Sequence, residues 1–203
     1  MALVSEYEGF IFDFGGVLVG HQTEADQAKL AELAGMHPDR FSERYWSHRL
    51  DYDKGFLSRI EYWEIVARNG GSTLTTDIIA RLADVDNESW MHFDPAMWKW
   101  VEELRNASKP VAMLSNMPRD LGEALKQKTD RLGQFDYVTL SYELGSAKPE
   151  PAIYEHCLAG LGTAPQKTLF LDDRLENVHA AEMLGICAIE FTSRDEVLTK
   201  LRT

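Results

Sequence analysis

The segment Phe10-Ile11-Phe12-Asp13-Phe14-Gly15-Gly16-Val17-Leu18-Val19 decides how the rest of the chain is interpreted. Its short, apolar and aromatic-rich beginning is typical of a strand that is buried on both faces. An ionised carboxylate is costly to bury without a partner, and the glycines let the backbone turn sharply and approach a ligand closely. Because ligands of open α/β sheets bind beyond the carboxyl ends of the strands, Asp13 stands where we expect a reaction centre. Taken alone, the pattern also fits an ordinary turn aspartate.

The composition narrows the classes of partner. The chain has 203 residues and a formal net charge of −12, which suits one large domain or a core with a smaller insertion, and which repels nucleic acid and anionic membranes. No stretch resembles a signal peptide or a membrane span. Cys157 and Cys187 show no metal-binding spacing, so we expect both to be buried, reduced side chains in a cytoplasmic protein. The composition is compatible with either a monomer or a homodimer.

Strand-like and helical segments alternate through most of the chain. Beyond the first strand, we expect strands at 111–114, 137–140, 168–171 and 187–189, of which 137–140 is the more exposed. Helical patterns cover 121–128, 152–161 and 175–184, with Gly162 and Gly185 as C-terminal stops of the last two. This alternation predicts right-handed crossovers and an α/β fold, with a Rossmann-like three-layer core around a parallel sheet.

Residues 21–90 break the alternation, because they contain helical patterns and no convincing strand. Trp46, Tyr62 and Trp63 are expected to form part of the core of this helical bundle. A bundle inserted directly after the first strand lies over the strand ends, where it can exclude water during chemistry and open for release. We therefore divide the chain into a core, 1–20 and 91–203, and an all-helical cap, 21–90. The four expected cap helices are 25–34, 38–48, 59–69 and 76–83.

Polar side chains gather at the carboxyl ends of the expected strands, and each alone also fits a helix cap or a surface position. The occurrence of all of them, each at a strand end and in this order along the chain, is much less expected by chance. They are Asp13, Ser115 with Asn116, Lys148 before a helix, and Asp172 with Asp173.

This set suits phosphoryl transfer. A phosphate monoester is a dianion, so the Asp13 carboxylate can attack phosphorus only when the repulsion between the two anions is screened. Mg²⁺ provides such screening and prefers carboxylate, carbonyl and water oxygens. Asp13, Asp173 and the Gly15 carbonyl can supply these ligands, with Asp172 as a direct or indirect support. The expected intermediate is an aspartyl phosphate.

The remaining polar groups can hold the phosphoryl group. The Lys148 ammonium can balance the charges of the nucleophile and the phosphate, which makes Lys148 a second candidate catalytic residue. The Ser115 hydroxyl and the Asn116 backbone amide can donate hydrogen bonds to phosphoryl oxygens.

Four segments, 12–18, 114–116, 148–149 and 170–173, resemble the four signature motifs of the haloacid dehalogenase superfamily, and the helical insertion resembles its C1 cap. Together they are similar to a branch with bacterial α-D-glucose-1-phosphate phosphatases and the N-terminal phosphatase domain of soluble epoxide hydrolase. The resemblance implies a Mg²⁺-dependent phosphatase that acts on a small phosphorylated metabolite, with a sugar phosphate as one candidate.

One position departs from the superfamily pattern. Most of its phosphatases have a second aspartate two residues after the nucleophile, which protonates the leaving group and later activates water; here that residue is Gly15. A cap residue could take over the role, the substrate could have a good leaving group such as an anomeric phosphate, or the protein could be a poor catalyst. The glucose-1-phosphate phosphatase also has glycine there, which favours retained activity. The cap candidates are His48, Asp51, Tyr52 and Asp53, within the polar stretch 48–56 that could face the core as a substrate loop.

Other functions stay open at this point. A non-catalytic phospho-ligand binder is one alternative, and a phosphotransferase or phosphomutase is another. Dehalogenases of the superfamily use no metal and need no acidic pair like Asp172-Asp173, so dehalogenation is less expected. Arg119 fits either a substrate contact or the surface. The other histidines show no ligand-like spacing and are expected at the surface or in the core: His21, His37, His92, His156 and His179.

Overall fold

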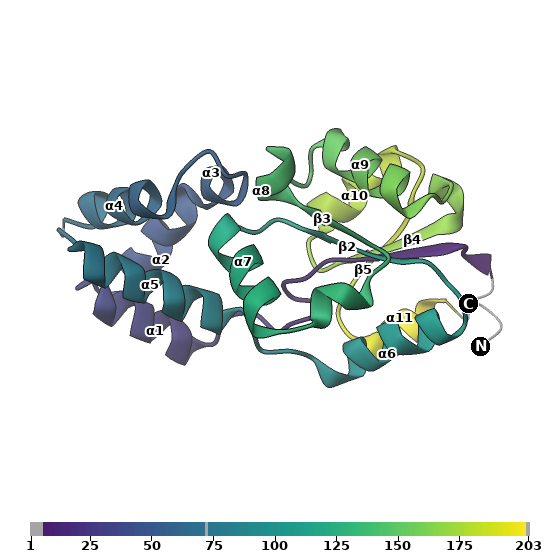
Figure 1. Ribbon diagram of the computed structural model, residues 1–203, viewed down its shortest axis with the longest axis horizontal. Helices are drawn as coiled ribbons and strands as arrows, with labels where there is room; N and C mark the ends of the chain where they lie inside the picture. The colour runs from purple at the N-terminus through teal and green to yellow at the C-terminus, as the bar shows by residue number, and fades with distance from the viewer. Residues whose placement is uncertain (1–5, 72, 202–203) are drawn as a thin grey trace.

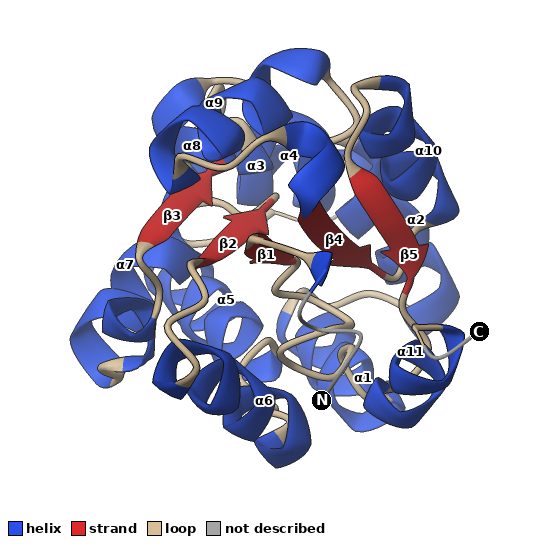
Figure 2. Ribbon diagram, turned by 90° about the vertical axis from the view of Figure 1, so that its right-hand side faces the viewer, coloured by secondary structure: helices blue, strands red, loops and turns tan. Residues whose placement is uncertain are grey.

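The computed structural model describes residues 6–71 and 73–201, and it confirms an α/β fold built on a parallel sheet. The five strands lie in the order β3-β2-β1-β4-β5 (Figure 2). Their bounds are β1 Gly9–Phe12, β2 Val111–Ser115, β3 Tyr137–Leu140, β4 Thr168–Asp172 and β5 Cys187–Glu190.

The first strand occupies the centre of the sheet because its side chains are apolar on both faces. Phe10 pairs with Val111 of β2 on one side and with Leu169 of β4 on the other. Since side chains alternate along a strand, Phe10 and Phe12 enter one hydrophobic cluster while Ile11 enters the other. All four residues of β1 are buried. The strand therefore directs its carboxyl end into the middle of the molecule.

Helices cover both faces of the sheet and complete the expected three layers (Figure 2). Helices α9 and α10 pack on the face that contains Ile11, while α6, α7 and α11 pack on the face that contains Phe10. Gly162 ends α9 in a left-handed conformation, and Gly185 follows α10 in the same conformation, as expected for C-terminal stops. The helix bounds are α6 Pro95–Asn106, α7 Arg119–Lys128, α8 Ser141–Leu144, α9 Pro151–Leu161, α10 Leu175–Met183 and α11 Arg194–Lys200, with short 3₁₀ turns at Arg131–Gln134 and Pro165–Lys167.

A bundle of helices lies beyond the carboxyl ends of the strands, at the left of Figure 1, and has a hydrophobic cluster of its own. Tyr62 and Trp63 are fully buried in it, as expected. The expectation was wrong for Trp46, which is 48% exposed because the face of its helix that enters the bundle has Phe41 and Tyr45 instead. The boundaries at 20/21 and 90/91 stay a prediction. The helices are α1 Glu24–Leu33, α2 Pro38–Ser47, α3 Arg49–Asp53, α4 Arg59–Gly70 and α5 Thr76–Ser89.

Several other details differ from the sequence expectation. The stretch after His48 begins with the short helix α3 rather than a loop, and α5 continues to Ser89 because polar residues of its last turns are buried. Strand β5 is at the sheet edge and only partly buried, so Cys187 is half-buried, whereas Cys157 is buried as expected. Helices α6, α8 and α11 were not anticipated.

Among the described residues, no helix has the length and apolarity that a membrane crossing requires.

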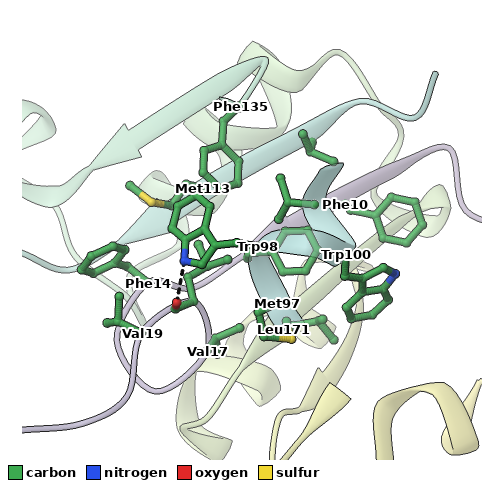
Figure 3. Close-up of a cluster of buried hydrophobic side chains, with 14 of the residues drawn as sticks. Phe10, Phe14, Val17, Val19, Met97, Trp98, Trp100, Met113, Phe135 and Leu171 are labelled. Atoms are coloured by element: carbon green, nitrogen blue, oxygen red, sulfur yellow. Dashed lines mark hydrogen bonds between the residues drawn. The ribbon is translucent and has the colours of Figure 1, made fainter. Parts of the chain in front are cut away.

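Trp98 of α6 joins the core to the segment that follows Asp13 (Figure 3). Its indole Nε1 donates a 2.8 Å hydrogen bond to the backbone carbonyl of Leu18, and its ring packs edge-on against Phe93 and Phe135. Trp98 is 4% exposed, so both the hydrogen bond and the ring contacts are shielded from water.

We expect Trp98→Phe to lower the free energy of unfolding by about 1–3 kcal/mol, because it removes a buried donor and part of a buried ring. Urea denaturation followed by circular dichroism measures this loss. Trp46→Phe is the matched control, and a change within about 0.5 kcal/mol is expected there because Trp46 is half-exposed. An equal loss of unfolding free energy in the two variants would contradict the stabilising role of the Trp98 hydrogen bond and ring contacts.

Candidate active site

Three adjacent strands bring the polar residues of the site together. Asp13 follows β1, and its backbone N–H donates to the Leu171 carbonyl at 2.9 Å, which extends the ladder beyond the last strand residue. Ser115 is the last residue of β2 and Asp172 is the last residue of β4. Because the strands are parallel and neighbouring, their carboxyl ends meet at one edge of the sheet.

Lys148 enters this edge from the loop before α9. The Asn116 side chain holds the Lys148 backbone in a reciprocal pair: its Nδ2 donates to the Lys148 carbonyl at 2.9 Å, and its Oδ1 accepts from the Lys148 N–H at 2.8 Å. The Lys148 Nζ lies 2.7 Å from Asp13 Oδ1 and 2.7 Å from Asp172 Oδ2. Lys148 is 3% exposed, so this ammonium is almost entirely neutralised by the two carboxylates rather than by water.

The three aspartates form one cluster. Oxygen atoms of Asp13, Asp172 and Asp173 all lie within 4.8 Å of one another. Asp172 is fully buried, and its Oδ1 accepts hydrogen bonds from the Arg174 N–H and from Asn177 Nδ2, both at 2.9 Å. The cluster therefore contains three carboxylates and one ammonium, which contacts two of them, so the ionised cluster has more negative than positive charge.

The pKa shifts reflect this crowding. Burial raises the pKa of the Asp13 carboxyl well above its usual value, against the opposing effect of Lys148 and together with repulsion from Asp172. Burial and then repulsion from Asp172 raise the pKa of Asp173. Burial opposes ionisation of Asp172 as well, but the Lys148 ammonium holds its pKa below the usual value. A divalent cation beside Asp13 and Asp173 would relieve the excess negative charge, and the all-oxygen donor set suits Mg²⁺.

A cavity of about 790 Å³ connects this cluster with the helical bundle. Asp172 does not line it; this residue lies behind the wall and supports Lys148 from there. Of the residues singled out in the core, the cavity is lined by Asp13, Gly15, Ser115, Asn116, Lys148 and Asp173.

The cap residues proposed from the sequence separate in the structure. Asp53 lines the cavity, whereas His48, Asp51 and Tyr52 do not. The helical turn of α3 explains the difference, because residues four apart share one face: Arg49 and Asp53 face the cavity together. Asp51 is exposed, with a carboxylate oxygen 4.0 Å from the His48 ring. The Tyr52 hydroxyl instead donates to Asp120 of α7 at 2.6 Å.

Arg49 connects two buried carboxylates of the cap. Its Nε donates to Asp53 Oδ1 at 2.8 Å, and its Nη1 donates to Asp86 Oδ2 at 3.0 Å. Burial raises the pKa of Asp53 to about 6 even though Arg49 acts in the opposite direction. One guanidinium shared between Asp53 and Asp86 thus leaves Asp53 easier to protonate than an ordinary aspartate.

Sequence reasoning missed several cavity residues. His21 has its Nε2 3.2 Å from Asp173 Oδ2, although its spacing suggested no site role; its closeness to the Asp13 segment was the available signal. Gly16 has φ of +76°, and a Cβ there would lie 2.6 Å from the Asp173 carboxyl, so a glycine is required.

Arg119 lies outside the cavity, with its guanidinium 4.9 Å from the centre of the Tyr142 ring.

Trp90 occupies the space beside Gly15. A Cβ at position 15 would lie 3.2 Å from Cζ3 of the Trp90 ring, which is tighter than ordinary van der Waals contact. The indole Nε1 donates to the Tyr45 hydroxyl at 3.2 Å, which ties the ring to the cap. Most phosphatases of the superfamily that this sequence resembles have an acidic residue at this position. Here an aromatic ring covers the space instead.

The shifted pKa of Asp53 predicts a specific pH dependence. The folded protein binds the Asp53 proton more tightly than the unfolded chain, so stability from this group is full below about pH 4 and is lost as the pH rises to about 6. We expect Asp53→Asn to flatten the pH profile of the unfolding free energy across this window by about 2 kcal/mol, measured by urea titrations. Asp51→Asn, at an exposed position of the same helix, is the control, and an equal flattening by both variants would contradict the prediction.

Comparisons with known proteins agree with this geometry. The family model of haloacid dehalogenase-like hydrolases matches residues 7–185. A sesquiterpene phosphatase of Aspergillus oryzae is 25% identical over 203 residues, which cover 98% of this chain and 97% of the relative. The D-ribitol-5-phosphate phosphatase of Bacteroides thetaiotaomicron is 26% identical over 190 residues, which cover 88% of each chain. A haloacid dehalogenase-family enzyme of the same bacterium, solved as a magnesium complex, has the same fold, with a TM-score of 0.79, 21% identity, and coverage of 98% of this chain and 100% of that one. The chain belongs to the haloacid dehalogenase-like hydrolase family.

Proposed function

We propose that this protein is a Mg²⁺-dependent phosphatase that hydrolyses a small phosphomonoester through an aspartyl phosphate on Asp13. The observation that carries the proposal is the cluster of Asp13, Asp172 and Asp173 within 4.8 Å, with the Lys148 ammonium between Asp13 and Asp172. The two curated relatives described above are named as phosphatases, which supports the same reaction class. A small phosphorylated metabolite of the cytoplasm is the expected substrate.

Asp13 is oriented for nucleophilic attack. Its Oδ1 accepts hydrogen bonds from the Phe14 N–H at 2.6 Å and from Lys148 Nζ at 2.7 Å, which fixes the plane of the carboxylate. In the first step a carboxylate oxygen of Asp13 forms a bond to phosphorus, and the bond between phosphorus and the alcohol oxygen breaks. In the second step water attacks phosphorus and the bond between phosphorus and the Asp13 oxygen breaks, which releases inorganic phosphate and restores the carboxylate; the proton that the water loses balances the one that the departed alkoxide takes up.

The other residues of the edge bind and neutralise the phosphoryl group. Asp13, Asp173 and the Gly15 carbonyl would hold Mg²⁺, and this cation supplies screening between the nucleophile and the phosphate dianion. The Ser115 hydroxyl and the Asn116 backbone amide donate to phosphoryl oxygens, and the Lys148 ammonium balances their charge.

Gly15 supplies no proton to the leaving alcohol. General acid–base assistance is typically worth about 10²–10⁴-fold in rate, so activity depends on how readily the leaving group accepts negative charge. Asp53 and His21 are two titratable side chains that line the cavity, and either could supply the proton in place of residue 15. The acidic cluster also argues against dehalogenation, for which such a cation site has no use.

We expect Asp13→Asn to reduce phosphate release from p-nitrophenyl phosphate by at least about 10³-fold, because the amide is not a nucleophile. Wild-type activity is expected to disappear with a chelator and to return with Mg²⁺. Asp39→Asn, at a side chain that is 95% exposed, is the control and should keep full activity. Turnover by Asp13→Asn would refute the covalent route, whereas binding of phosphate esters by the wild type without turnover would favour a non-catalytic binder.

A second variant tests the missing acid. Gly15→Asp restores a carboxyl group at the position, but its Cβ would press on Trp90, so Trp90→Phe is combined with it to make room. We expect the double variant to raise kcat for alkyl phosphates relative to p-nitrophenyl phosphate, by up to about 10²-fold, because poor leaving groups gain most from protonation. Trp90→Phe alone is the control. An unchanged ratio would show that another residue already provides the proton.

A further inference from the structure

Part of the cavity is lined by large apolar side chains. Trp46 and Leu50 of the cap each keep 48% of their surface exposed while they line the cavity, and Trp90 is half-buried beside them. We call Trp46, Leu50 and Trp90 the apolar wall. Its two rings meet edge to face, with centroids 6.4 Å apart and an interplanar angle of 83°. Large apolar surface at a cavity gains free energy when a ligand covers it.

The apolar wall adjoins the reaction centre directly. The Trp90 ring lies over Gly15, two residues from Asp13, as the 3.2 Å approach to a Cβ at position 15 shows. A phosphoryl group held at Asp13 therefore places its alcohol part next to the indole of Trp90. From there the apolar wall continues through Trp46 and Leu50 of the cap.

The polar groups of the cap side are already paired with one another. Arg49 donates to Asp53 and Asp86, and the Gln22 amide donates to Asp86 at 3.1 Å and to the Ser89 hydroxyl at 2.7 Å. Of the other described polar side chains of the cap that line the cavity, Gln27 has no hydrogen bond within the protein, and the His21 ring lies 3.2 Å from Asp173. A polyol would lose its hydration on entry and find few free partners on the cap side in exchange.

We propose that this cavity selects phosphomonoesters whose alcohol part is apolar, with that part packed against the apolar wall. The inference rests on the proposed phosphatase function and names the substrate class of the same site. It replaces the sugar phosphate suggested by the sequence with an ester of a hydrocarbon-rich alcohol.

The test compares two primary alkyl phosphates with similar leaving-group chemistry, n-octyl phosphate and ribitol 5-phosphate. With the full chain and Mg²⁺, we expect kcat/KM to be at least about tenfold higher for n-octyl phosphate, because only its alcohol part gains from burial against the apolar wall. An equal or higher kcat/KM for ribitol 5-phosphate overturns the inference and leaves the phosphatase proposal standing.

Two aliphatic positions of the cap provide matched variants. Leu50 and Ile60 are 48% and 49% exposed, and of the two only Leu50 lines the cavity. Leu50→Ala is expected to raise KM for n-octyl phosphate by about five- to tenfold and to affect ribitol 5-phosphate less. Ile60→Ala is expected to change neither value. Equal effects of Leu50→Ala and Ile60→Ala on n-octyl phosphate also overturn the inference.

Binding measurements separate this inference from the proposed function. The Asp13→Asn variant lacks the nucleophile, so calorimetry with Mg²⁺ gives Kd for both esters without turnover. Tighter binding of n-octyl phosphate supports the inference even if the wild type hydrolyses neither ester, an outcome that would refute only the phosphatase proposal. Equal or weaker binding of n-octyl phosphate counts against the apolar selection whatever the turnover.

Discussion

The contact of the Lys148 ammonium with Asp13 and Asp172 is the interaction on which the site depends. A buried ion pair is stabilising only when its geometry is good and its other hydrogen bonds are made. Both conditions hold here: Asp172 is also bonded by Asn177 and the Arg174 N–H, and Asn116 fixes the Lys148 backbone. The nucleophile is therefore held in one orientation by residues from three separate parts of the chain.

The cap is joined to the core by several polar contacts. Asp120 of α7 accepts from the Tyr52 hydroxyl and from Arg59, Lys54 pairs with Glu150, and the Ser141 hydroxyl donates to the Asp53 carbonyl. These contacts connect α3 and α4 of the cap to α7, α8 and the loop before α9. They place α3 with Leu50 and Asp53 toward the strand ends, so the cap and the core together define what fits beside Asp13.

The position of Trp90 links two properties of the protein. Its ring lies where a side chain at residue 15 would project, so the absence of an acid beside the nucleophile and the presence of an aromatic surface have one structural basis. A site built in this way gives up a proton donor and gains apolar contact area next to the scissile bond. The proposed preference for apolar alcohols follows from that exchange.

The sequence determined the parallel α/β core and the gathering of polar residues at its edge. Phe10-Ile11-Phe12 is apolar at every position, as is typical of a central strand buried on both faces, and the ends of neighbouring parallel strands meet at one edge of the sheet. Local patterns also identified Gly162 and Gly185 as helix stops, since left-handed backbone favours glycine. Tertiary structure alone decided which cap residues reach the site. His48, Asp51, Tyr52 and Asp53 are equally polar in sequence, and only the docking of α3 turned Asp53 inward and Asp51 outward. The half-exposed Trp46, the ring of Trp90 over Gly15 and the contact of His21 with Asp173 likewise join residues from separate elements, and such contacts leave no periodic pattern in the chain.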